Sequence, residues 1–357
     1  MPEPAPVQTP NPDEGGLEAI IALKKAKVAE LRARGLDPYP ARALRQHACA
    51  RVPELAAKLA EPAAHSAETV SLAGRLVELR PMGKSIFARL ADLSGHAQVY
   101  FKKDAMPEPE FELVKKDVHV GDFLSVTGTV FRTKTGEPTV AVQSVVLLAK
   151  ALRPLPEKWH GLTDVDLRYR QRHLDLIATP ESRDVFLKRA KIISTVRRVL
   201  DSRGYVEVET PVLLGQAGGA SARPFHTHHN ALDQDMVLRI ALELYLKKLV
   251  IGGLDRVYEI GRVFRNEGID TSHNPEFTML EAYEAYSDYE GMAALFETML
   301  SECAEAIGVA AVEWRGVKLD LKPPFRRIYL PEIWKERCGE PIEAVLQGKG
   351  FDRAGLL

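Results

Sequence analysis

One polar hairpin in this sequence carries the residue types that recognition of a charged ligand requires. Residues 256–289 predict a strand, a polar loop and a second strand. Side chains two residues apart on a strand point to the same face, so Arg265 and Glu267 share a face of the first strand. One face of the second strand carries four side chains, namely Phe277, Met279, Glu281 and Tyr283.

Together these side chains suit a ligand that has a phosphate, a flat base and an amine. A guanidinium grips phosphate oxygens in pairs, an aromatic ring stacks on a base, and carboxylates attract an ammonium group. A solvated sheet face is the alternative, but its polar residues are usually lysine, threonine and serine. The hairpin therefore predicts a ligand site.

Helices and further strands must hold this hairpin in place. A helix is expected to begin at Thr179–Pro180, with a capping hydroxyl and a proline at its first position, and to end at Gly204. A strand follows and is broken by Pro211. The other expected elements are helices at 240–250 and 292–307 and a strand pair at 312–321. They predict an α+β domain at 179–357, with a mainly antiparallel sheet flanked by helices.

Five short alternating segments between Thr69 and Lys150, separated by turn signals, predict a small closed barrel of the OB-fold type. Such barrels bind single-stranded nucleic acid by stacking bases on exposed aromatic rings. Phe87 follows a tight turn and Arg80 precedes it. Ile86 and Phe87 are adjacent and must face opposite ways, so one of them is expected on the outside. The alternative is that Phe87 lies in the core.

The composition and the remaining segments are typical of a soluble globular protein. Of 357 residues, 45% are hydrophobic and 27% charged, with a net charge of −1, so any nucleic-acid contact must come from local basic clusters. Residues 1–16 are rich in proline and lack the apolar core of a signal peptide, so they predict a disordered tail. Residues 17–68 predict a helical region and 151–178 a linker. No apolar run is long enough to cross a bilayer, so no membrane contact is expected.

The cysteines and histidines predict neither a disulfide nor a metal site. The three cysteines lie far apart and form no CxxC pair, which fits a reducing cytoplasm; they are Cys49, Cys303 and Cys338. The cluster His226, His228 and His229 has no acid or cysteine partner at ligand spacing and is interpreted as structural. The chain also lacks GxGxxG and GxxxxGKS/T, so neither a Rossmann nor a P-loop nucleotide site is expected.

The two halves of the hairpin, GRVFRNEG at 261–268 and HNPEFTMLEAY at 273–283, resemble motif 2 of the class II aminoacyl-tRNA synthetases in its bacterial lysyl form. Further segments similar to that family lie at 74–92, 162–177, 206–214, 218–233 and 238–253. The resemblance covers nearly the whole chain after the first dozen or so residues. It implies an N-terminal OB-fold anticodon-binding domain followed by a class II catalytic domain.

The activity that this resemblance implies is that of a lysine–tRNA ligase. Such an enzyme activates L-lysine with ATP, in the presence of Mg²⁺, to lysyl-adenylate and transfers the lysyl group to the 3′ end of tRNA(Lys). The resemblance also implies a cytoplasmic homodimer. The attacking lysine carboxylate is already charged, so the site must supply positioning and charge neutralisation rather than a general base.

For ATP, the resemblance implies a role for five residues of the hairpin. Arg265 would bind the α-phosphate and act in catalysis, and Glu267 would hold the adenine amino group. Phe277 would stack on the adenine, and His273 would reach the β- and γ-phosphates with Asn274 beside it.

For lysine, the resemblance implies the carboxylates of Glu243 and Glu281, the phenol of Tyr283 and the backbone at Gly219. Without the resemblance, a glutamate on a helix is more often an ordinary surface residue, and Gly219 an ordinary loop glycine. Leu242 departs from the family, which usually has proline just before the helix segment of Glu243.

In the barrel, the resemblance places Arg80, Phe87, Gln98 and Glu137 against the anticodon bases of tRNA(Lys). It also assigns the long helix and the strand around Pro211 to the interface of the homodimer. An amphipathic helix packed on its own sheet is the alternative for that segment.

The third motif of class II synthetases is absent before Leu357. We therefore expect an incomplete catalytic domain that exposes apolar surface, with its Mg²⁺ ligands beyond Leu357. An inactive truncated synthetase that binds the tRNA anticodon is the alternative function. Aspartyl and asparaginyl synthetases are disfavoured, because an acid-rich pocket does not suit their substrates. The short paralogue that lysylates a translation factor is also disfavoured. It lacks the front barrel and keeps the third motif, which is the opposite of this sequence.

Overall fold

The structure is a computed structural model that describes residues 16–61, 64–155, 164–339, 341–342, 346–347 and 350–351. The chain divides into two compact units, Met1–Pro180 and Glu181–Leu357. The predicted tail at 1–16 lies outside the described residues except for Gly16, as does part of the predicted linker. Among the described helices, none combines the length and the apolar character that a membrane crossing requires.

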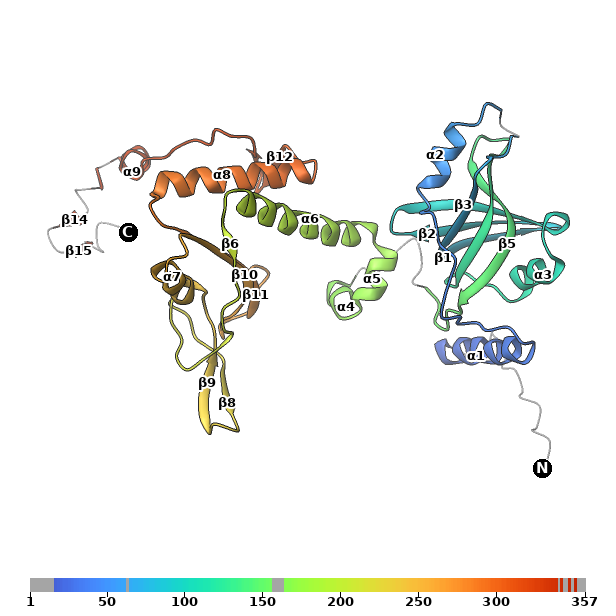
Figure 1. Cartoon of the computed structure of the whole chain (residues 1–357), viewed down its shortest axis with the longest axis horizontal. Helices are drawn as coiled ribbons and strands as arrows, with labels where there is room; N and C mark the ends of the chain where they lie inside the picture. Colours follow the sequence, from blue (N-terminus) through green and yellow to red (C-terminus); the bar gives the residue numbers. More distant parts are fainter. Residues whose placement is uncertain are drawn as a thin grey trace. The chain divides into compact units, whose positions relative to one another are not determined.

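Unit 1 contains a closed five-stranded barrel, which confirms the predicted OB-type architecture (Figure 1). The order of the strands around the barrel is β1-β2-β3-β5-β4, so the last strand in sequence lies between β3 and β4. It pairs with β3 in parallel and with β4 antiparallel. The bounds of the strands are β1 Thr69–Met82, β2 Ser85–Asp92, β3 Gly95–Lys102, β4 Phe123–Arg132 and β5 Pro138–Ala149.

Alternation of side chains builds the barrel interior, and two glycines allow its strands to cross closely. In β2, Ile86, Ala88 and Leu90 are almost fully buried, while the residues between them are half-exposed. A Cβ atom added at Gly128 would lie 2.0 Å from the carbonyl oxygen of Ala141, and one at Gly74 would lie 2.6 Å from that of Ala91. Neither position has space for a side chain, so only glycine allows these neighbouring strands to approach so closely.

The N-terminal helices of unit 1 share the core of the barrel. Leu31, Cys49, Val52 and Leu55 belong to the same buried cluster as the inward side chains of the strands. The helices and turns of this part are α1 Leu17–Ala33, α2 Arg51–Ala57, the 3-10 turn η1 Lys103–Ala105 and α3 Glu108–Lys116. The region before Thr69 is therefore a structural part of the barrel unit.

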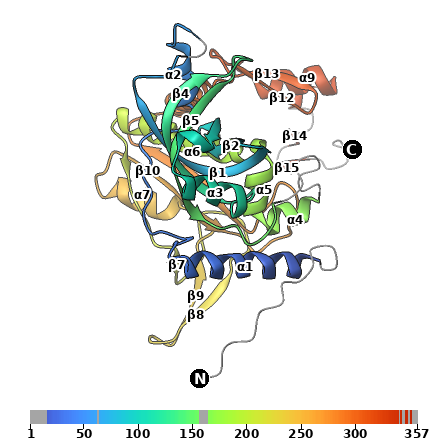
Figure 2. The same ribbon diagram turned by 90° about the vertical axis from the view of Figure 1, so that its right-hand side faces the viewer.

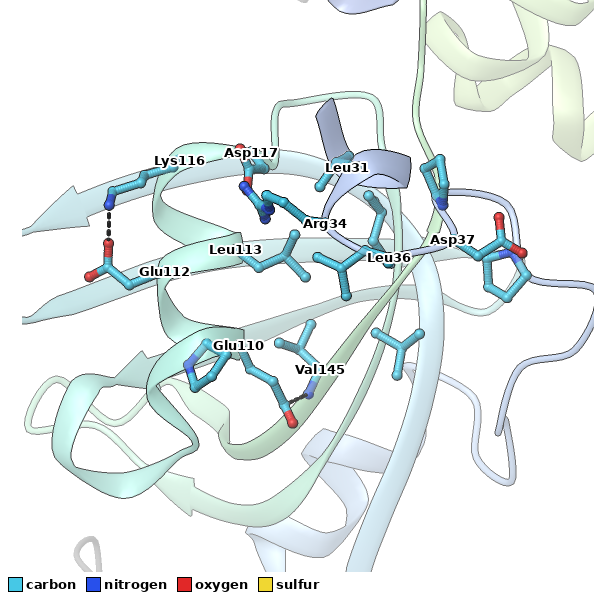
Figure 3. Close-up of a pocket in the computed structure, with 16 residues that line it drawn as sticks. Leu31, Arg34, Leu36, Asp37, Glu110, Glu112, Leu113, Lys116, Asp117 and Val145 are labelled. Carbon is cyan, nitrogen blue, oxygen red and sulfur yellow. Dashed lines mark hydrogen bonds and ion pairs between the residues drawn. The ribbon is translucent and has the colours of Figure 1, made fainter. Parts of the chain in front are cut away.

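A cavity of about 720 Å³ lies between the end of α1, the α3 helix and β5 (Figure 3). Its floor is apolar, with Leu31 and Leu113 among its lining residues. The Arg34 guanidinium donates to Asp117 at 2.7 Å, and the Val145 amide donates to the Glu110 carboxylate at 2.6 Å. The first pair joins the end of α1 to the end of α3, and the second attaches α3 to β5.

The second half of the predicted linker at 151–178 contains two short helices, α4 Val165–Arg170 and α5 Arg172–Ala178. Asp164 caps α4 by accepting a hydrogen bond from the Leu167 amide at 2.8 Å. The buried Asp175 carboxylate pairs with Arg168 at 2.7 Å and also with Arg172. The prolines and the glycine that suggested a linker all precede these helices.

Unit 2 is an α+β arrangement, as predicted, in which helices flank short sheets (Figures 1 and 2). One sheet has the order β11-β10-β6 and another has the order β7-β9-β8. The β8–β9 hairpin projects from the unit in both views. The helices are α6 Pro180–Ser202, α7 Glu243–Ile251, α8 Tyr289–Ala306 and α9 Leu330–Cys338. The strands are β6 Val206–Glu207, β7 Leu213–Leu214, β8 His226–His229, β9 Gln234–Leu238, β10 Arg256–Phe264, β11 Glu276–Glu284, β12 Ala311–Trp314, β13 Val317–Asp320, β14 Leu346–Gln347 and β15 Gly350–Phe351.

Three boundaries in unit 2 differ from the sequence prediction. The strand expected around Pro211 is reduced to the two short strands β6 and β7. The helix expected from Ile240 begins at Glu243, because Arg239–Leu242 is bonded to neighbouring strands: the Arg239 amide donates to Val212 and its carbonyl accepts from Phe264. The first strand of the hairpin ends at Phe264, so placing Arg265 and Glu267 on it was wrong.

Candidate functional sites

The β10–β11 hairpin has one face toward α7 and the other toward α6 and α8. Paired residues across the hairpin are Val263 with Phe277, Gly261 with Met279, Glu259 with Glu281 and Val257 with Tyr283. The apolar members of these pairs pack with Leu242 and Leu246, at the start and middle of α7. On the other face, Tyr258, Leu280 and Ala282 pack with helices α6 and α8. This division confirms the predicted parity of the second strand.

Arg265 and Phe277 come together at the open end of this face. The guanidinium carbon of Arg265 lies 5.3 Å from the centroid of the Phe277 ring, within cation–π range. The Arg265 amide donates to the Pro275 carbonyl at 2.8 Å, and its Nε donates to the Ile240 carbonyl at 3.4 Å. Arg265 thus keeps the predicted place beside Phe277, although it lies one residue beyond the strand.

The loop of the hairpin holds the other predicted ATP residues. The His273 ring Nδ1 lies 2.7 Å from an Asp270 carboxylate oxygen, and both side chains are largely exposed. Hydrogen bonds from the Ser272 amide and from His273 lower the pKa of Asp270 below its ordinary value. The Asn274 side chain donates to the Glu276 carbonyl at 2.6 Å, and Glu267 is exposed. Among the described residues, no hydrogen bond or ion pair joins these side chains to the side chains of Arg265 or Phe277.

The predicted lysine-binding residues gather further along the same face. The Glu281 carboxylate accepts hydrogen bonds from the Leu242 amide at 3.1 Å and from the Tyr283 hydroxyl at 2.9 Å. Burial raises the pKa of Tyr283, and so do its bond to Glu281 and the nearby charge of Glu243. A Cβ atom added at Gly219 would lie 3.1 Å from the Glu243 Cβ, and its φ of +85° favours glycine.

Glu243 lies in the first turn of α7, where the positive end of the helix dipole stabilises a carboxylate. It accepts a hydrogen bond from Lys247 at 2.6 Å. Leu242 donates its amide to Glu281, a bond that the proline expected here from the resemblance could not make. The Glu281 carboxylate and Tyr283 phenol on the sheet, with the Glu243 carboxylate of the neighbouring helix α7, can hold an ammonium group.

Sequence reasoning missed a buried ion pair directly beside this group. The Arg239 guanidinium donates to Glu259 at 2.6 Å and to the Thr210 carbonyl at 2.9 Å, and both charged side chains are 4% exposed. The other Glu259 oxygen accepts from the Thr210 hydroxyl at 2.6 Å. A charged residue at an inward position among apolar neighbours could have signalled Glu259, because buried charges require partners.

The four predicted anticodon residues line one cavity of about 520 Å³ on the surface of the barrel. They are Arg80, Phe87, Gln98 and Glu137. Phe87 is half-exposed while Ile86 is buried, so the core alternative for Phe87 was wrong. The rings of Phe87 and Tyr100 are 4.6 Å apart at their centroids, and one Arg80 nitrogen lies 3.3 Å from the Gln98 oxygen.

The histidine cluster does have acid neighbours, contrary to the sequence interpretation. His228 lies 2.9 Å from Asp235 and 3.3 Å from Asp233 on the exposed β8–β9 hairpin. Within the described parts of the chain, however, no group of three or more His, Cys, Asp or Glu residues could hold a metal ion.

The fold and both sites define a class of protein, and comparison with known families identifies it. The tRNA synthetases class II (D, K and N) match residues 164–353, and the OB-fold nucleic acid binding domain matches residues 70–148. The chain belongs to this family of class II tRNA synthetases.

Its relatives include enzymes specific for lysine. The lysine–tRNA ligase of Enterococcus faecalis is 52% identical over 89% of this chain and 64% of the relative. The chloroplastic/mitochondrial lysine–tRNA ligase of Arabidopsis thaliana is 47% identical over 90% of this chain and 54% of the relative. The lysine–tRNA ligase of Moorella thermoacetica is 48% identical over 94% of this chain and 68% of the relative. These relatives confirm the resemblance to the lysyl form. The chain spans 54–68% of their lengths.

Proposed function

We propose that this chain acts in lysine–tRNA ligation, with ATP and L-lysine bound on the β10–β11 face and the anticodon of tRNA(Lys) bound by the barrel. One observation carries the proposal: a cation over an aromatic ring, Arg265 and Phe277, lies at a sheet face that also carries the Glu281 carboxylate, and the Glu243 carboxylate of α7 is near Tyr283 on that face. The first pair suits a phosphate and a base, and the second suits the ammonium groups of lysine.

In the first step, a lysine carboxylate oxygen forms a bond to the α-phosphorus of ATP while the bond from that phosphorus to the bridging oxygen breaks. Pyrophosphate leaves with the electron pair, and lysyl-adenylate remains. Arg265 neutralises charge that develops on the α-phosphate, and Phe277 holds the adenine in position. In the second step, a terminal ribose hydroxyl oxygen of tRNA forms an ester bond to the lysyl carbonyl carbon while the bond from that carbon to the phosphate oxygen breaks. AMP leaves with the electron pair, and its phosphate takes up the hydroxyl proton.

Selectivity for lysine follows from the acids of the site. Glu243 and Glu281 attract a ligand that carries ammonium groups, whereas aspartate would bring another carboxylate into contact with them. Glu281 is already oriented by the Leu242 amide and the Tyr283 hydroxyl, so little ordering is needed when lysine binds.

Lysine-dependent ATP–pyrophosphate exchange by the chain tests this function. We expect exchange with lysine but not with aspartate or asparagine, and we expect Arg265→Ala to remove it. Arg262→Ala is the matched control, because Arg262 is exposed and lies on the opposite face of the same hairpin. Exchange that survives Arg265→Ala would overturn the ATP-site assignment.

Anticodon binding without lysine activation is a second candidate function, because the cavity around Phe87 is built entirely from unit 1 residues. Stacking of one base on an aromatic ring contributes about 1–3 kcal/mol, so Phe87→Ala should weaken binding of a UUU anticodon stem–loop about tenfold to a hundredfold. Tyr169→Ala, which removes an exposed ring outside the cavity, is the control. Stem–loop binding without any exchange activity would favour this second function.

A cytoplasmic homodimer completes the proposal. The described cysteines Cys49, Cys303 and Cys338 are all free, which suits a reducing compartment. Exposed apolar side chains on α6 and around Pro211 provide surface for a second copy; Val185, Phe186 and Val212 are 63%, 50% and 38% exposed. Sedimentation equilibrium of the chain tests the dimer, and a monomer at micromolar concentration would contradict it.

A further inference from the structure

A row of alternating charges runs along the rim of the barrel cavity. The Arg80 guanidinium lies 3.1 Å from one Glu78 oxygen, and the Arg89 guanidinium lies 3.8 Å from the other. Arg89 also donates to Glu137 at 2.9 Å. Glu78 therefore lies between two arginines, and Arg89 lies between two glutamates.

Gln98 and the backbone of the Glu137 segment are fixed from below. The Gln98 amide nitrogen donates to the Thr139 hydroxyl at 2.9 Å, and that hydroxyl donates to the Glu137 carbonyl at 3.0 Å. This arrangement directs the Gln98 oxygen toward Arg80. Gln98 is 6% exposed and Thr139 fully buried, so this part of the cavity is rigid.

Arg80 and Glu137 are different, because their side chains are 53% and 41% exposed and reach their positions through long flexible stems. Arg80 pairs on the rim with Glu78, and Glu137 pairs with Arg89; neither Glu78 nor Arg89 lines the cavity. Without Glu78, the two arginines would repel each other. Without Arg89, the two glutamates would.

A donor at Arg80 and an acceptor at Glu137 match a base edge that presents a carbonyl oxygen beside a ring N–H. Uracil and guanine present such an edge. Cytosine and adenine present an unprotonated ring nitrogen beside an amino group, which would set an acceptor against the Glu137 carboxylate. The cavity therefore discriminates between bases only while both side chains keep their places.

We propose that Glu78 and Arg89 are positioning residues that hold Arg80 and Glu137 for selection of a uracil-type or guanine-type edge over cytosine. The inference rests on the proposed anticodon-binding function of this cavity. Ion pairs at this degree of exposure contribute little to folding, so their removal should leave the barrel intact. Their effect should appear in base discrimination.

The test measures the affinity of the full chain for anticodon stem–loops in which each U of a UUU anticodon is replaced in turn by C or by G. For Arg89→Met and Glu78→Gln, we expect the preference for U over C at one position to fall about tenfold, with an unchanged melting temperature. Arg89→Lys should show a preference between those of the unmodified chain and Arg89→Met, because an ammonium lacks the planar guanidinium that contacts both carboxylates. The G series shows whether the cavity takes the uracil or the guanine form of this edge.

Arg45→Met is the matched control for loss of a surface charge. Arg45 pairs with Asp92 at 2.9 Å on the same barrel and lies outside the cavity lining. Arg45→Met should either leave the affinities unchanged or lower the affinity for every stem–loop by the same factor. In both cases the preference for U over C stays the same. Unchanged preference in Arg89→Met and Glu78→Gln would overturn the positioning role, as would an early melt with equal loss for all RNAs. If the unmodified chain itself shows no preference, the anticodon function fails first.

Discussion

Replacement of Arg239 by methionine should destabilise unit 2 far more than any surface substitution. The side chain of Arg239 is 4% exposed and donates to Glu259 at 2.6 Å, to the Arg262 carbonyl at 2.8 Å and to Thr210 at 2.9 Å. Its removal leaves the Glu259 carboxylate buried without a counter-charge. Breaking one side of such a pair costs about 3–5 kcal/mol of unfolding free energy.

The assay is guanidinium unfolding followed by tryptophan fluorescence, because Trp314 and Trp334 lie in unit 2. In a thermal melt followed by the same fluorescence, a loss of this size should lower the melting temperature by on the order of 10 °C. Arg262→Met is the control, since it removes an exposed arginine from the same strand and should change the unfolding free energy by less than about 0.5 kcal/mol.

A double variant separates the ion pair from general packing. In Arg239→Met with Glu259→Leu, no buried charge remains, so the cost should be smaller than the sum of the two single costs by more than about 1 kcal/mol. Additive costs would refute the reasoning, as would a single cost below about 1 kcal/mol for Arg239→Met. Either result would mean that water or a rearranged partner satisfies Glu259.

Three further outcomes are expected. Gly261→Ala should destabilise unit 2 by about 1–3 kcal/mol, because the added methyl would lie 2.2 Å from a buried guanidinium nitrogen. Gly268→Ala is the control and should not destabilise it, because nothing lies within 4 Å of its added methyl. Equal melting temperatures of the two variants would contradict this prediction. Burial and a neighbouring lysine ammonium lower the pKa of His119, so the stability that its neutral form contributes is present above its unfolded pKa, about 6.5, and is lost as pH falls below it. His119→Gln should flatten the pH dependence of unit 1 unfolding between about pH 7 and pH 5, and an unchanged slope would exclude this residue as its source. Glu281→Gln should weaken lysine binding by calorimetry much more than ATP binding, since a charged contact becomes neutral, and equal losses would make the residue structural.

The sequence was most informative where local pattern determines structure. Turn signals and alternation predicted the five-stranded barrel, and the two-residue period placed Phe277, Glu281 and Tyr283 on one face. Adjacent Ile86 and Phe87 had to face opposite ways, and they do. These properties depend on neighbours in sequence, so composition and spacing suffice to find them.

Features that depend on distant partners could not be predicted. Arg239 and Glu259 are separated by 20 positions, and only the folded sheet brings them together. The end of β10 before Arg265 depends on the residue across the hairpin: the Arg265 amide donates to the Pro275 carbonyl, and Pro275 has no N–H to donate in return. The helices after Asp164 were missed because proline and glycine upstream suggested a linker, although the capping aspartate was visible in the sequence.

The position of β5 has a consequence for how this protein is made. The strand is the last of the barrel to leave the ribosome, yet it lies between β3 and β4 and pairs with both. While only residues up to about 132 have been synthesised, β3 and β4 each have an unpaired edge, which is the kind of surface on which nascent chains associate. Synthesis of β5 closes both edges at once, and Lys150, directly after it, brings the fully buried ammonium that bonds to Asp122 at 2.6 Å. A ribosome pause while this strand is still inside the exit tunnel would therefore prolong the most aggregation-prone stage of synthesis, whereas a pause after Lys150 has emerged would leave a barrel that is already closed.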